Sequence, residues 1–153
     1  MKLVVGCGRL MTSDLDKILS FVTSNLTLVD SRSVCGIEHL NQAATLSLSS
    51  HNNGFNLSKD KSTEVLLYLT SLRQISKALK LAGINKDTKA VGWVYFGESS
   101  PDLSEIIVED DSVISIKSYD FSNLAKDIDV TLEDQIKQKI IMTRTAILPV
   151  QPR

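Results

Sequence analysis

Three cationic side chains on one predicted helix are the residues best suited to contact nucleic acid. Arg73, Lys77 and Lys80 are spaced by four and three residues, so on a helix they fall within about 60° of one another. Gln74 and Ser76 flank this ridge and offer hydrogen-bonding groups of the kind that read base edges. A row of cations on a helix is more commonly a solvated face, and the pattern by itself favours that interpretation.

The ridge lies on what we predict to be one long helix from Glu64 to Ile84. Apolar residues recur along it at helical spacing, and Gly83 supplies a stop signal at its end. The apolar face comprises Val65, Tyr68, Leu72, Ile75, Ala78, Leu79 and Ala82. We therefore expect this helix to bury one face against the core and to leave the cations in solvent.

A second pattern, near the N-terminus, suggests a dinucleotide site. Gly6 and Gly8 follow a predicted strand, and Asp30 ends the next strand at about the distance where a dinucleotide-binding fold places its ribose carboxylate. Met11 stands where the motif requires a third glycine, and its bulk opposes the close helix–strand packing that this glycine permits. An ordinary pair of glycines between strand and turn is the favoured interpretation. A small nucleotide-binding α/β domain that uses Gly6 and Gly8 is the alternative.

The other reactive residues form no recognisable catalytic or metal-binding motif. His39 and His51 have no second ligand at metal spacing, and Cys7 and Cys35 form no CxxC pair. The acidic run at 109–111 is more typical of a solvated turn than of a metal site. The sequence also has no P-loop, GxSxG or kinase motif. We expect no catalytic set, no cofactor, no metal and two buried free thiols.

Composition indicates one globular domain with at most a local nucleic-acid site. The chain has 153 residues, 42% of them hydrophobic and 23% charged, which suffices for a core. Its formal net charge is −1, whereas proteins that bind long stretches of nucleic acid through phosphates are normally basic. The first residues are too soon polar for a signal peptide, and no run of about 18 apolar residues occurs. We expect a cytoplasmic protein with no membrane contact.

Helical and strand patterns are mixed along the chain without repeats or linkers, which predicts a single domain over residues 1–153. We expect strands at 2–6, 26–29, 89–97 and 113–117, and helices at 15–22, 34–50, 64–84, 121–128 and 131–144. The composition of 51–61 predicts a loop, that of 101–108 either a short helix or a strand, and that of 148–153 an extended tail.

Several strings in the middle of the chain together resemble a known family. They are Cys35-Gly36-Ile37-Glu38-His39-Leu40 with Ala43, then Asn56, Glu64 with Leu66-Leu67-Tyr68, Arg73-Gln74-Ile75 with Ala78-Leu79, and Gly83-Ile84. In this order, over about 34–97, the chain resembles the smallest core subunit family of the KEOPS complex, the PRPK-binding protein family. The family usually has a glycine just ahead of the Arg-Gln pair, where this chain has Ser71-Leu72. The substitution leaves open whether the helix is interrupted there.

The resemblance implies a non-catalytic subunit of KEOPS, the complex that makes the threonylcarbamoyladenosine modification of tRNA. It implies a single α+β domain with helices packed on a small mixed sheet. The partners it implies are the kinase-like ATPase subunit, which this subunit regulates, and tRNA, including the 3′ CCA end. It implies no small-molecule substrate. The helix from Val34 and the C-terminal helix are candidates for the kinase contact, although the core would also use their apolar faces.

On the same resemblance we expect one group of side chains to form the RNA site: Arg73, Gln74, Ile75, Ser76, Lys77, Asn56, Lys59 and Glu64. Arg73 is expected to contact RNA, because its planar guanidinium can hold a phosphate with two hydrogen bonds or lie flat on a base. The competing interpretation is that Arg73 pairs with an acidic residue and braces the helix. Asn56 and Lys59, on the preceding loop, are expected to close the pocket.

Overall fold

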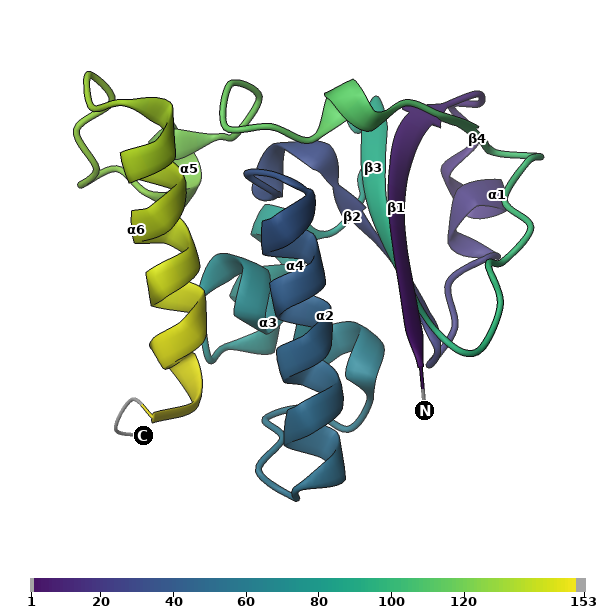
Figure 1. Cartoon of the computed structure of the whole chain (residues 1–153). Helices are drawn as coiled ribbons and strands as arrows, with labels where there is room; N and C mark the ends of the chain where they lie inside the picture. Colours follow the sequence, from purple (N-terminus) through teal and green to yellow (C-terminus); the bar gives the residue numbers. More distant parts are fainter. Residues whose placement is uncertain (1, 151–153) are drawn as a thin grey trace.

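A computed structural model describes residues 2–150, and its centre is a four-stranded sheet with helices on both faces (Figure 1). The strands are β1 (Leu3–Leu10), β2 (Leu26–Asp30), β3 (Ala90–Phe96) and β4 (Ile107–Glu109). The helices are α1 (Leu15–Leu19), α2 (Ile37–Asn52), α3 (Lys61–Thr70), α4 (Ile75–Ala82), α5 (Phe121–Leu124) and α6 (Asp134–Ile147). Three 3-10 turns are η1 (Ser31–Ser33), η2 (Asp111–Val113) and η3 (Leu148–Val150).

The sheet has the order β2-β3-β1-β4, and every pairing in it is antiparallel. The α+β class is therefore confirmed, with helices on an antiparallel sheet rather than the mixed sheet that the resemblance implied. Strand patterns reveal where strands occur, but the direction of each strand depends on how the intervening helices cross the sheet. The expected strands near 2–6, 26–29 and 89–97 are confirmed as β1, β2 and β3.

Three hydrophobic clusters hold the layers together. The largest lies between the sheet and helices α2, α3 and α4, and includes the fully buried Leu40, Val65 and Leu67. A second cluster fills the opposite face, where α1 and the segment before β4 cover Trp93. The third joins α6 to the segment at 119–128. In Figure 1, α6 lies outside α2, on the side away from the sheet, so it forms an outer layer.

Two predicted elements near the C-terminus are wrong. The strand expected at 113–117 is a turn, because Ser118 Oγ donates to the Val113 carbonyl (3.2 Å) and accepts from Ser115 N–H (3.2 Å). Such local side-chain bonds compete with strand pairing. The tail expected from 148 does not extend at once, since Leu148 is fully buried and begins η3. Residues 151–153 of that prediction lie outside the described part of the chain.

Smaller differences concern the ends of elements. The helix expected at 121–128 is only α5, and the open choice at 101–108 is settled as a turn that leads into β4. The helix expected from 34 begins at Ile37, after a buried segment that includes Val34 and Cys35. Within residues 2–150, no helix is both long and apolar enough to cross a membrane.

Candidate nucleic-acid interface

The single helix predicted from Glu64 to Ile84 is wrong, because the structure has two helices there, α3 and α4. Apolar residues continue at helical spacing across the break, so the periodicity does not reveal it. Arg73 lies in the break. It therefore does not share one helical ridge with Lys77 and Lys80, which both belong to α4.

Ser71 makes the break by taking the left-handed backbone conformation, with φ at 58°. Its N–H donates to the Tyr68 carbonyl (3.2 Å). The N–H of Leu72 donates to the Leu67 carbonyl (3.1 Å). These two bonds form a Schellman motif, in which the left-handed position usually holds glycine. The helix is thus interrupted even though serine stands where the family usually has glycine.

Two aliphatic side chains of α4 lie in solvent although their spacing predicted burial. Ala78 and Ala82 are buried and attach the helix to the core. Ile75 is 40% exposed and Leu79 is 48% exposed. The break turns α4 relative to α3, so small residues face inward and these two large ones form an apolar strip on the surface.

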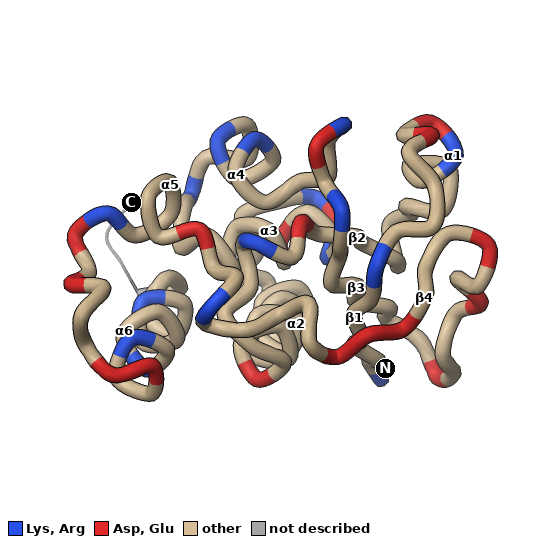
Figure 2. Tube along the Cα trace, turned by 90° about the horizontal axis from the view of Figure 1, so that it is seen from above, with Lys and Arg blue, Asp and Glu red and all other residues tan. Residues whose placement is uncertain are grey.

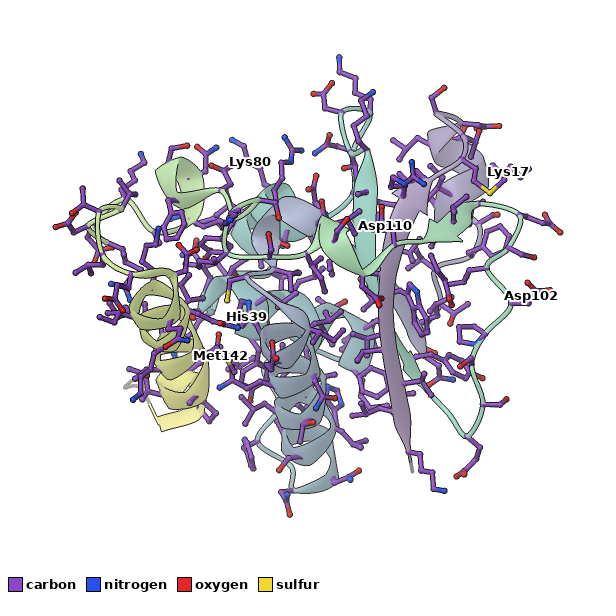
Figure 3. All side chains as sticks on the ribbon, turned by 45° about the horizontal axis from the view of Figure 1, so that its top comes forward. Lys17, His39, Lys80, Asp102, Asp110 and Met142 are labelled. Carbon is purple, nitrogen blue, oxygen red and sulfur yellow. The ribbon has the colours of Figure 1, made fainter. Side chains whose placement is uncertain are left out.

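Two cations lie on the same helix as this strip. Lys77 and Lys80 are exposed, and α4 contains no acidic residue. Figure 2 shows only blue and uncharged segments along α4, and Figure 3 shows Lys80 at the periphery. Gln74 is the exposed N-cap residue, and its side chain makes no capping bond. Because the first N–H groups of a helix have no intrahelical partner, those of Ile75 and Ser76 can bind an anion there.

Arg73 ties the break to the end of the last helix. The side chain is half-buried, and its Nη2 donates to the Leu148 carbonyl (2.7 Å). From the sequence, Arg73 was expected to contact either RNA or an acidic residue, and the structure adds a third type of contact, a backbone carbonyl. The last carbonyls of a helix need partners from outside it, and arginine can supply one.

Glu64 is buried within the first turn of α3, so it has no surface with which to touch RNA. Its carboxylate accepts from the N–H groups of Leu57 (2.9 Å) and Ser58 (2.8 Å). It also accepts from the hydroxyls of Ser58 (2.8 Å) and Ser50 (2.9 Å). Glu64 therefore fixes the conformation of the loop after α2, which is the loop that carries Asn56 and Lys59.

That loop is not beside Arg73. Asn56 and Lys59 are exposed and lie next to the first turn of α3, whereas Arg73 follows the opposite end of this helix. α3 has 10 residues, so its two ends are about 15 Å apart along the axis. The structure thus brings together Arg73, Gln74, Ile75, Ser76 and Lys77. It places Asn56 and Lys59 at a second position, too far away to close a pocket around Arg73.

A series of buried hydrogen bonds links α2, α6 and the end of α3, and no pattern in the sequence predicts it. Cys35 N–H donates to His39 Nδ1 (3.2 Å), and the Thr145 hydroxyl donates to the Tyr68 carbonyl (2.8 Å). His39 Nε2 and Thr145 Oγ1 are 3.1 Å apart, and the Thr145 hydrogen is already used, so Nε2–H is the donor. Burial lowers the pKa of His39 to about 4. A neutral histidine, labelled in Figure 3, thus joins α2 to α6, and Thr145 joins α6 to the end of α3.

The structure contradicts the dinucleotide alternative. Gly6 and Gly8 lie inside β1 and not in a turn that opens a helix. A Cβ on Gly6 would collide with the ring of Trp93, so this glycine permits cross-strand packing. Asp30 accepts from Arg32 Nη2 (2.6 Å) and from the Thr88 hydroxyl (2.8 Å), which leaves its carboxylate occupied. Burial alone would raise the pKa of Asp30, but these hydrogen bonds lower it below the usual value.

Both cysteines are free and buried, as predicted. Burial raises the pKa of Cys7 to about 11 and that of Cys35 to about 12, so neither thiol is a ready nucleophile. Among residues 2–150, no group of three or more His, Cys, Asp or Glu side chains could hold a metal ion.

Comparison with known proteins places the chain in a family. The sequence model of the family described as "Kinase binding protein CGI-121" matches residues 12–143, so the chain belongs to this family. The chain is also similar to the protein named "KEOPS complex subunit Cgi121" from Pyrococcus abyssi (strain GE5 / Orsay), with 28% identity over 100 residues. The match covers 65% of this chain and 56% of the relative, so the chain spans about half the length of that relative. The resemblance recognised in the sequence is confirmed, and the family match begins well before residue 34.

Proposed function

We propose that this chain is a non-catalytic KEOPS subunit that binds tRNA through the 3′ CCA end and also binds the kinase-like ATPase subunit. In this role it supports the threonylcarbamoyladenosine modification of tRNA. Membership of a kinase-binding family and similarity to a KEOPS subunit support the protein partner. The observation that carries the RNA part is the surface of α4, where Ile75 and Leu79 lie exposed on the same helix as the exposed Lys77 and Lys80.

The α4 surface has the groups that a single-stranded RNA end requires. Such ends are bound by packing of splayed bases on flat or apolar side chains, by hydrogen bonds to base edges and by local cations on phosphates. Ile75 and Leu79 offer the apolar floor, and Lys77 and Lys80 offer the cations. Gln74 offers an amide that can hydrogen-bond to a base edge.

Arg73 contributes at the edge of this surface while it remains tethered to Leu148. Its guanidinium is planar and carries its N–H donors in a fixed geometry, a shape that suits a phosphate as well as the Leu148 carbonyl. Glu64 acts indirectly in this proposal, because it fixes the loop that holds Asn56 and Lys59. Those two residues would contact RNA beyond the terminal nucleotides, since they lie at the other end of α3.

The low net charge agrees with this arrangement. A formal charge of −1 gives no general attraction for RNA, so binding must come from the local surface at α4 and from surfaces that partners supply. We expect the isolated chain to bind tRNA weakly, with a salt dependence that corresponds to few phosphate contacts.

The test compares intact tRNA with the same tRNA lacking CCA. Fluorescence titration should show at least tenfold weaker binding without CCA, and equal affinities would contradict the role of the 3′ end. Co-purification with the cognate kinase-like subunit tests the protein partner separately. A clean failure to co-purify at micromolar concentration would contradict that half of the proposal.

A further inference from the structure

The edge strand β4 carries main-chain groups that no other strand uses. Asp110 N–H, directly after β4, donates to the Cys7 carbonyl (3.3 Å), so Asp110 faces β1. Because successive residues of a strand alternate in direction, Glu109 and Ile107 face the open side. Ile107 N–H donates to the Leu103 carbonyl (2.9 Å), whereas the Ile107 carbonyl and both main-chain groups of Glu109 have no partner within residues 2–150. Such an edge can pair with an additional strand.

A hollow of about 220 Å³ adjoins this edge, on the face of the sheet that α1 covers. Trp93, the turn at 101–104, Ile107 and Glu109 line it. A Cβ on Gly6 would collide with the ring of Trp93, so the glycine of β1 is what lets this ring extend from β3 over β1. The hollow therefore lies where a side chain from a strand added to β4 can enter it.

Trp93 brings an unused hydrogen-bond donor to the hollow. The residue is only 6% exposed, and a buried indole N–H usually has a partner. Nε1 of Trp93 makes no hydrogen bond within residues 2–150, yet it keeps contact with solvent. A main-chain carbonyl of an added strand is the kind of acceptor that this donor lacks.

Acidic side chains dominate the edge and the hollow. Residues 98–111 contain six Asp or Glu and no Lys or Arg. Two of the six pair with cations elsewhere in the chain, and the other four form no ion pair within residues 2–150. Figure 2 shows red segments at β4 and in the loop before it, and Figure 3 shows Asp102 at the periphery. The four acidic residues without an ion pair are all exposed: Asp102, Glu105, Glu109 and Asp111.

We propose that the free edge of β4 and the adjoining hollow bind an extended, basic segment of a partner protein. This β4 surface is defined by Trp93, Asp102, Ile107 and Glu109. The segment adds a strand through the free main-chain groups of β4, and one of its arginine or lysine side chains enters the acidic hollow. Main-chain bonds supply affinity in this mode of binding, and the hollow selects the side chain.

The charges of this surface argue against two other occupants. A second copy of the chain would pair one β4 with another and set like charges opposite each other, which is unfavourable. RNA would bring phosphates to a stretch that has carboxylates and no cation of its own. The β4 surface is therefore distinct from the α4 surface in its ligand, and it does not depend on the function proposed for α4.

The test is titration of the full chain into a short, fluorescently labelled peptide in which arginine alternates with valine. The control peptide has glutamate in place of every arginine. We expect saturable binding of the arginine peptide, about tenfold or more tighter than that of the glutamate peptide, because only the first complements the carboxylates. Equal affinities, or no saturable binding of the arginine peptide, would overturn the proposal.

Two substitutions at one position separate strand addition from general attraction. Glu109→Gln removes only the charge and should weaken binding severalfold. Glu109→Pro also removes the N–H that faces the open side, a position where edge strands tolerate proline, and should weaken binding further, by about tenfold or more. The matched control is Glu133→Gln, an exposed carboxylate before α6, which should leave binding unchanged. Equal losses in Glu109→Gln and Glu133→Gln would mean a general charge effect and overturn the site.

Hydrogen exchange of the wild-type chain tests strand addition without any substitution. Saturation with the arginine peptide should slow exchange of the Glu109 amide about tenfold or more, because this N–H gains an acceptor. The Asp110 amide, which already donates to Cys7, is the internal control and should change much less. Unchanged exchange at Glu109 in the saturated complex would overturn strand addition at β4.

Discussion

α4 and α6 both expose aliphatic side chains, yet their surroundings differ. Ile75 and Leu79 are exposed on α4, a helix that carries two lysines and no acidic residue. On α6 the exposed Ile136 and Ile147 accompany charges of both signs, several of them already paired. Exposed apolar surface alone says only that something binds there. The charges beside it differ, since α4 has no acidic residue whereas α6 carries charges of both signs.

The two helices also differ in how the core holds them. α4 packs through two small residues, Ala78 and Ala82, whereas α6 is held partly by buried hydrogen bonds through Thr145. Arg73 connects the two helices, since it precedes α4 and donates to Leu148 at the end of α6. The comparison therefore predicts that some variants change stability alone and others change binding alone.

The largest expected effect is on stability and comes from the residue of the predicted RNA group that is buried. Glu64→Ala should lower the free energy of unfolding by about 4 kcal/mol, because buried N–H and O–H groups lose their acceptor and a cavity remains. Urea denaturation measures this. Under conditions where the variant is folded, tRNA affinity should fall much less than for Arg73→Ala. If Glu64→Ala kept the full stability of the wild type but lost its affinity for tRNA, Glu64 would be an RNA-contacting residue and this prediction would be wrong.

Acid should weaken the attachment of α6 through His39. The unfolded chain has a histidine pKa of 6.5 and the folded chain one of about 4, so the unfolded state binds more protons between these values. Stability should therefore be complete above pH 6.5 and fall by up to about 3 kcal/mol as the pH drops to about 4. Urea denaturation across this range measures it. His39→Gln cannot titrate and should flatten the slope, and an unchanged slope would contradict the assignment.

Arg73→Ala should affect both properties, because the side chain braces the break and borders the α4 surface. Affinity for tRNA should fall by about 1–3 kcal/mol if a phosphate or base contact is lost. Stability should fall by about 1 kcal/mol through the bond to Leu148. Titration and a melting curve of the same variant separate the two effects. A large drop in melting temperature with unchanged affinity would make Arg73 purely structural.

The smallest expected effect concerns the left-handed residue between α3 and α4. Ser71→Gly should raise the free energy of unfolding by about 0.5–1 kcal/mol, because glycine adopts this conformation without the penalty of a Cβ. Gly54→Ser is the reciprocal control: φ at Gly54 is 77° and its Cβ position is open, so only the backbone penalty is added. Destabilisation by Ser71→Gly would show that the serine side chain holds the break.

The sequence predicted the composition of the α4 surface better than its geometry. The string from Arg73 to Lys77 was singled out from residue types and a family resemblance, and the structure keeps these residues together. The apolar residues keep helical spacing across Ser71, so their periodicity did not predict the break that the left-handed conformation of Ser71 makes. The same periodicity assigned Ile75 and Leu79 to the core, because it cannot show that a helix changes direction within the pattern.

Long-range polar contacts were beyond prediction. Glu64 looked like a surface carboxylate at a helix start, and only the folded loop shows that Leu57 and Ser58 surround it. The hydrogen bonds that run from Cys35 through His39 to Thr145 join residues 110 positions apart. The spacing of residue types along a sequence does not predict contacts between such distant positions. The glycines of β1 were misread for a related reason, because Gly6 leaves space for Trp93 and Gly8 for Ile107 and Val108, all of which lie on strands distant in the sequence.

The most direct test of the account compares one glutamate substitution on each helix for binding to the same tRNA. Ile75→Glu and Ile136→Glu alter side chains of similar exposure, 40% and 45%, and add the same charge. We predict that Ile75→Glu weakens tRNA binding at least tenfold, while Ile136→Glu leaves it within twofold of wild type, with both variants folded by melting curve. Equal losses, or a loss confined to Ile136→Glu, would contradict the assignment of the RNA end to α4.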